Sequence, residues 1–61
     1  MPTKRLSVGM AGESIAARFL QRRGATICDR NVRVGRDEID VVASIADVLV
    51  AVEVKTGQGY G

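Results

Sequence analysis

The spacing of apolar residues predicts one helix near the start of the chain. Between residues 7 and 23 the apolar positions recur every three or four residues, as on one face of an amphipathic helix. Ser7 suits the N-cap of this helix and Gly24 a left-handed C-terminal cap, while residues 1–6 are expected to form a flexible leader. The expected inward face consists of Val8, Gly12, Ile15, Ala16, Phe19 and Leu20.

Three strands are expected after the helix. Residues 26–34 have the mixed pattern of an edge strand, residues 38–43 alternate, and residues 48–55 form the strongest strand. In the middle strand, Ile39 and Val41 are expected to face one way and Asp40 the other. Turns are expected at 35–37 and 44–47. This order predicts a single α/β domain over residues 1–61, with one helix followed by a three-stranded antiparallel meander.

The chain is short and lacks the residues that dominate many metal and redox sites. It has 61 residues, no His and a single cysteine, Cys28, which cannot form a disulfide within the chain and is expected to be a small buried residue. Any metal must therefore be held by oxygen atoms, which favours Mg²⁺ or Mn²⁺. No apolar run has the length of a signal peptide or a membrane span, so the protein is interpreted as cytoplasmic.

Charge is distributed unevenly along the chain. The net charge is +2, but residues 1–36 hold eight of the nine basic residues and residues 37–61 hold five of the seven acids. This asymmetry fits a surface for the phosphate backbone of DNA beside a metal site, and it fits an ordinary solvated helix face equally well. Only two aromatic residues are present, which argues against recognition by base stacking. The candidate phosphate contacts are Arg18, Arg22, Arg30, Arg33 and Arg36.

Three charged residues on the last two strands carry the candidate chemistry. Glu53 and Lys55 are two apart on one strand, and Asp40 is expected across the hairpin from Glu53, within roughly 5–8 Å. Two carboxylates between apolar strands repel each other and lose hydration, and a shared divalent cation removes both costs. The Lys55 ammonium can then orient a water and offset charge on a scissile phosphate. The alternative is a solvent-facing Glu–Lys pair with Asp40 as a chance neighbour.

Four motifs, in this order, resemble those of the YraN-like family of uncharacterised bacterial proteins. They are Gly12-Glu13-x-x-Ala16, Asn31-Val32-Arg33, Asp37-Glu38-Ile39-Asp40-Val41 and Val52-Glu53-Val54-Lys55-Thr56. The resemblance spans about residues 8–61, and the chain looks like the family's amino-terminal half. The family is a branch of the restriction-endonuclease-like superfamily, with the PD-(D/E)XK nuclease signature. The resemblance therefore implies a truncated restriction-endonuclease-like core, a divalent-metal site and DNA as the substrate.

The resemblance also implies roles for individual residues. Asp40 and Glu53 would bind the metal together with the backbone carbonyl of Val54, and Lys55 would be the catalytic lysine. Glu13 matches a further acid beside the metal, although an acid near a helix N-terminus also has the simpler role of favouring the helix dipole.

The function expected from these residues is that of a metal-dependent, nuclease-like protein acting on DNA phosphodiester bonds, with branched or damaged DNA as possible substrates. The alternatives are a non-catalytic nucleic-acid-binding module and an inactive truncated fragment that mainly oligomerises. A homo-oligomer is expected in any case, because one helix can cover only one face of the sheet.

Overall fold

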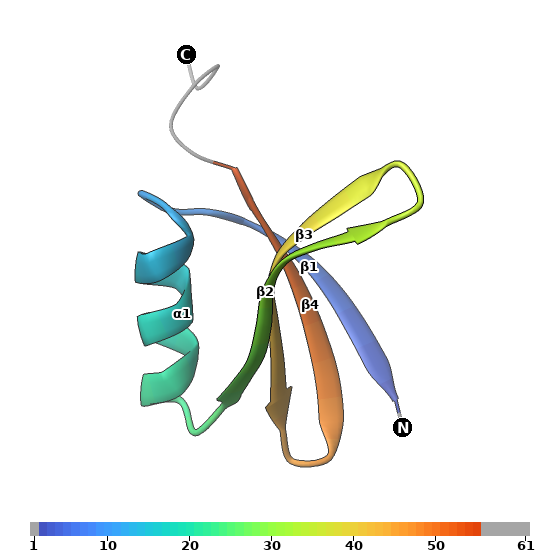
Figure 1. Cartoon of the computed structure of the whole chain (residues 1–61). Coiled ribbons are helices and arrows are strands. Elements are labelled where there is room, and N and C mark those ends of the chain that lie inside the picture. The colour runs from blue at the N-terminus through green and yellow to red at the C-terminus, as the bar shows by residue number, and fades with distance from the viewer. Residues whose placement is uncertain (1, 56–61) are drawn as a thin grey trace.

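A computed structural model, which describes residues 2–55, has one helix packed on one face of a four-stranded mixed sheet (Figure 1). Its elements are β1 (Thr3–Gly9), α1 (Glu13–Arg22), β2 (Thr26–Val34), β3 (Asp37–Ile45) and β4 (Val48–Lys55). The sheet order is β1-β4-β3-β2, with β1 parallel to β4 and the other neighbours antiparallel. The predicted α/β class, with a helix followed by an antiparallel meander, is confirmed, and β1 adds a fourth strand.

The prediction of a flexible leader and of a helix that begins at Ser7 is wrong. Residues Thr3–Gly9 form β1, and the helix begins only at Glu13. A helix from residue 7 would contain Gly9 and Gly12, each of which costs about 1 kcal/mol relative to Ala in a helix interior. Gly12 instead has a φ of 142°, which favours glycine, and precedes the first helical residue. Pairing with β4 also satisfies backbone groups along the edge of that strand.

The C-terminal end of α1 is the end that the sequence predicts. Gly24 has a φ of 91°, its N–H donates to the Gln21 carbonyl, and the Ala25 N–H donates to the Leu20 carbonyl, each at 3.0 Å. These two bonds form a Schellman motif, which satisfies carbonyls that the end of a helix leaves unpaired. The glycine therefore ends the helix, as expected, and turns the chain into β2.

The helix contacts the sheet through smaller residues than predicted. Ala16 and Ala17 are buried, whereas Ile15 and Phe19 of the predicted inward face are 52% and 41% exposed. The core cluster joins Ala17 to valines of β3 and β4, with Leu20 packed against it. Because alanine side chains are short, the helix axis can lie close to the sheet at this point. We call this side of the sheet the helix-covered face.

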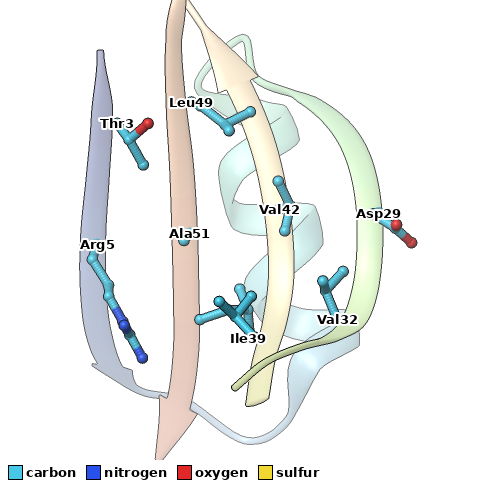
Figure 2. A pocket seen from close by; sticks show the side chains of 9 residues that line it. Thr3, Arg5, Asp29, Val32, Ile39, Val42, Leu49 and Ala51 are labelled. Carbon is cyan, nitrogen blue, oxygen red and sulfur yellow. The ribbon is translucent and has the colours of Figure 1, made fainter. Parts of the chain in front are cut away.

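The opposite side of the sheet, which we call the open face, has no helix over it among residues 2–55 (Figure 2). It contains an apolar hollow of about 420 Å³ that crosses all four strands. The residues that line the hollow are Thr3, Arg5, Asp29, Val32, Val34, Ile39, Val42, Leu49 and Ala51.

The predicted alternation along β3 fails at Ile39. Ile39 lines the hollow together with Val42, three residues away, whereas Val41 packs in the core on the other face. Across the ladder, β2 contains Asn31 with a φ of 55°. Asparagine tolerates this left-handed conformation better than most residues. The last pair of β3 with β4 is Val41–Val52, so the alternation along β3 fails where this strand leaves β4.

The two hairpin turns have different conformations. Gly35, between β2 and β3, has a φ of 61°, as the first position of a type II′ turn requires. Ala46 and Asp47, between β3 and β4, both have positive φ values, of 49° and 63°, as a type I′ turn requires. Alanine is strained in this conformation because it has a Cβ.

Cys28 is exposed, contrary to prediction. It lies where the pairing of β2 with β3 shifts by one residue, between Ile27 and Asp29. A bulge of this kind leaves the extra residue unpaired with the neighbouring strand, so its burial cannot be inferred from simple alternation. Within residues 2–55, no helix is long and apolar enough to span a membrane.

Candidate functional site

Asp40 lies where β3 separates from β4. The paired residues of the two strands run from Ile45–Val48 to Val41–Val52, and Asp40 comes directly after the last pair. Its carboxylate Oδ2 accepts a hydrogen bond from the Val54 N–H at 2.7 Å. A charged acceptor makes a short and strong hydrogen bond with a backbone N–H. The half-buried Asp40 side chain therefore replaces the β3 backbone as the hydrogen-bond partner of β4 at the point where the pairing of the two strands ends. Asp40 and Val54, two of the predicted ligands, are therefore in contact.

Glu13, the first residue of α1, directs its half-buried side chain toward β2. Its Oε1 lies 3.4 Å from the Asn31 Nδ2, which donates a weak hydrogen bond. Its Oε2 is buried, and no hydrogen-bond partner for it is found in the part of the chain that the structure describes. An unpaired buried carboxylate oxygen is costly, although the helix N-terminus offsets part of the cost. This oxygen is therefore suited to a ligand such as a water or a cation.

A line of polar groups crosses the molecule from α1 to β4. Asn31 lies between the pairs Arg30–Val41 and Val32–Ile39, which places it opposite Asp40 on the neighbouring strand. Glu13, Asn31, Asp40 and the Val54 N–H thus follow one another across four elements. From the sequence, Asn31 was known only as part of the Asn31-Val32-Arg33 motif, and no role in the site was predicted for it. The signal available was an asparagine inside a strand pattern, where this residue type often adopts a left-handed conformation.

Glu53 points to the open face and is bound by Arg5 of β1. The Arg5 Nε and Nη2 both lie 2.9 Å from the Glu53 Oε2, and Nη2 also lies 2.9 Å from the Asp37 Oδ2. These hydrogen bonds, with Asp37 first and Glu53 second, raise the pKa of Arg5 above its ordinary value. Arg5 was missed because residues 1–6 were interpreted as a leader. Lys55 is exposed and follows Glu53 by two residues at the end of β4.

The predicted metal ligands are only partly brought together. Asp40 contacts Val54, and Glu13 is connected to the same region through Asn31, whereas Glu53 is bound to Arg5. Over residues 2–55, no three His, Cys, Asp or Glu side chains gather as a group that could hold a metal. The unpaired Oε2 of Glu13 and the all-oxygen donors nevertheless fit a hard cation such as Mg²⁺ or Mn²⁺. The ligand set stays a prediction.

The candidate phosphate contacts are all exposed and lie on two separate parts of the surface. Arg18 and Arg22 lie beside the exposed Ile15 and Phe19 on the outer side of α1. The others, Arg30, Arg33 and Arg36, lie on the edge strand β2 and in the turn that follows it. Both groups are accessible to a polyanion, and their binding to DNA stays a prediction.

Comparison with known proteins identifies the family. Residues 12–61 match the model of the uncharacterised protein family UPF0102. The chain belongs to this family. It is 49% identical over 59 residues to a UPF0102 protein of Syntrophotalea carbinolica. The aligned residues cover 97% of this chain and 48% of that relative. It is also 54% identical over 56 residues to a UPF0102 protein of Symbiobacterium thermophilum, covering 88% and 48% of the two chains.

The family assignment confirms the resemblance inferred from the four motifs. A UPF0102 protein of Rhodococcus opacus is 48% identical over 56 residues, covering 92% of this chain and 48% of the relative. The chain thus spans about half the length of the curated UPF0102 relatives that it matches. The match to the family model begins at residue 12, so the whole of β1 lies outside it. No solved structure matches the chain.

Proposed function

We propose that this UPF0102 protein is a metal-dependent, nuclease-like protein that acts on DNA phosphodiester bonds, including those of branched or damaged DNA. The observation that supports this most is the buried, unpaired Oε2 of Glu13, in line with Asn31, Asp40 and Val54. A carboxylate oxygen is rarely left buried without a partner unless a ligand completes it. The same region contains Asp40 of β3 and Val54 of β4, which are in contact.

Each residue has a separate role in this proposal. The carboxylates of Asp40, Glu53 and Glu13, with the Val54 carbonyl, would hold Mg²⁺ or Mn²⁺, which when bound supplies a Lewis acid. Lys55, two residues beyond Glu53, would orient the attacking water and offset negative charge on the phosphate. The exposed arginines would contact DNA phosphates, so binding should be independent of base sequence and sensitive to salt.

Calorimetric titration with Mn²⁺ tests the metal site. Wild type is expected to bind Mn²⁺ weakly and to prefer Mg²⁺ or Mn²⁺ over Zn²⁺, because the donors are all oxygen. The double variant Asp40→Asn, Glu53→Gln is expected to lose this binding. The matched control Asp47→Asn, Glu38→Gln removes the same charge at two exposed positions and should bind as wild type does. Equal binding by all three proteins would contradict the metal site.

A cleavage assay separates an enzyme from a DNA-binding module. Duplex, branched and single-stranded DNA are incubated with the protein in Mn²⁺, and binding is measured in parallel by gel shift. Lys55→Ala is expected to abolish cleavage while leaving binding intact. Its control, Lys4→Ala, removes an exposed lysine of β1. Binding without cleavage by wild type on all three substrates would favour the non-catalytic module.

The open face supports a second proposal, that the chain forms a homo-oligomer. Its hollow is lined mainly by apolar side chains, and Arg5 and Asp29, at its edges, have opposite charges. A face with an apolar centre and with charges of both signs suits a symmetric contact with a second copy. In such a contact the same surface of each copy faces the other, so opposite charges can pair. At about 25 cal/mol per Å², burial of a few hundred Å² of this face would contribute several kcal/mol.

A further inference from the structure

Arg5 is placed to control the availability of Glu53. In the parallel pairing of β1 with β4, Arg5 lies opposite Ala51 and Ser7 lies opposite Glu53. Arg5 and Glu53 are therefore diagonal neighbours on the open face, where the Arg5 side chain runs along the edge of the sheet toward β4 (Figure 2). Two of its nitrogens, Nε and Nη2, contact the same carboxylate oxygen, Glu53 Oε2.

This contact conflicts with a metal ligand at the same position. A divalent cation that used Glu53 Oε2 would lie close to the guanidinium, and the two positive charges would repel. The Glu53 side chain is only 26% exposed, so solvent screens this repulsion less than it would at a fully exposed site. Arg5 and the cation would therefore compete for the same oxygen.

Asp37 offers the guanidinium a second partner. The Arg5 Nη2 lies 2.9 Å from the Asp37 Oδ2 as well as from Glu53, and the Asp37 side chain is 55% exposed. Arg5 can leave Glu53 without losing every ionic contact, because Asp37 keeps one of them. A small movement of the Arg5 side chain would therefore be enough to release Glu53 while the contact with Asp37 is kept.

We propose that Arg5 is an internal competitor of the divalent cation: it occupies Glu53 when the metal is absent and is transferred to Asp37 when the metal binds. This inference rests on the proposed metal site. It makes Arg5 a positioning residue that sets the affinity for the cation, and it gives β1, which lies wholly outside the family match, a role in the site.

Two measurements on the whole chain test the competition. Mn²⁺ titration by calorimetry compares wild type with Arg5→Gln and with Lys4→Gln, which removes the same charge from the next residue of β1. Arg5→Gln is expected to bind Mn²⁺ roughly fivefold more tightly, the size expected for one partly exposed ion pair, and Lys4→Gln to change less than about twofold. In a Glu53→Gln background, Arg5→Gln should have no effect, because the shared oxygen is gone.

The second measurement uses wild type alone, so its result does not depend on whether a variant folds correctly. Addition of Mg²⁺ should shift the ¹⁵N–¹H signal of the Arg5 Nε–H, as its bond to Glu53 breaks.

Each outcome decides between the two proposals. The competition would be overturned, and the metal site would remain, if Arg5→Gln bound Mn²⁺ as tightly as wild type or more weakly and the Arg5 signal did not change. Absence of Mn²⁺ binding in both proteins at millimolar concentration would overturn the metal site and the competition with it. Tighter binding that appears only with an intact Glu53, together with the signal shift, would support both.

Discussion

The two faces of this sheet carry similar apolar residues, but these residues are buried to different extents. On the helix-covered face, Val41, Val50 and Val52 pack with Ala17 into a core in which each is at most 6% exposed. On the open face, Val42, Leu49 and Ala51 of the same two strands are only half-buried around a hollow. Alternating residues of one strand thus have unequal burial because only one face has a helix over it. Stability should depend on the first face, and ligand or partner binding on the second.

The largest expected effect tests this division of stability. Val52→Ala, on the helix-covered face, should lower the free energy of unfolding by roughly 2 kcal/mol, because it leaves a cavity in a core that cannot fully collapse. Val42→Ala, on the open face, should lower it by less than about 1 kcal/mol, because its side chain is already partly in solvent. Urea denaturation measures both, and equal losses would show that the open face is buried in solution.

The next effect concerns assembly through the open face. Val42→Lys places a charge at the hollow and should raise the dissociation constant of a homo-oligomer by more than about tenfold, or about 1.4 kcal/mol. Sedimentation at several concentrations measures it. Ile15→Lys, at an exposed apolar position on the outer side of α1, is the matched control and should leave the dissociation constant unchanged. A wild type that sediments as a monomer throughout would refute the assembly.

A smaller effect tests the ligand-binding role of Glu13, the first residue of α1. Mg²⁺ at about five times its dissociation constant should raise the free energy of unfolding of wild type by about 1 kcal/mol, since it binds only the folded chain. Glu13→Gln should lose most of this gain, whereas Glu38→Gln, an exposed acid of β3, should keep it. The comparison is made by thermal unfolding with and without Mg²⁺. An equal gain in all three proteins would exclude Glu13 as a ligand.

The smallest expected effect concerns a residue that lies in a turn and on neither face of the sheet. Ala46 is in the left-handed conformation in the turn between β3 and β4, and glycine has no Cβ to strain there. Ala46→Gly should therefore stabilise the chain by about 0.5–1 kcal/mol, without changing Mn²⁺ affinity or oligomeric state. A destabilised variant in urea denaturation would mean that the turn differs from the one described.

Local signals in the sequence determined a large part of this fold. Strand β2 has the predicted residues 26–34 and β4 the predicted 48–55, because both are rich in β-branched residues and lie between turn-forming residues. Gly24 ended the helix as predicted, since only a residue without a side chain adopts that conformation at little cost. The motifs that contain Glu13, Asp40 and Glu53 also identified the family correctly. All of these depend on a few neighbouring residues.

The tertiary structure decided the rest. Whether residues 3–9 joined a helix or a sheet depended on an unpaired edge of β4 more than forty positions away, and Arg5 contacts Glu53 across a separation of 48 residues. The sequence placed Asp40 and Glu53 on neighbouring strands, but it did not show that Asp40 would bind the Val54 N–H or that Glu53 would be held by Arg5. Periodicity reports which side of an element a residue occupies. The partner of a charged side chain depends on which strands the whole chain brings side by side.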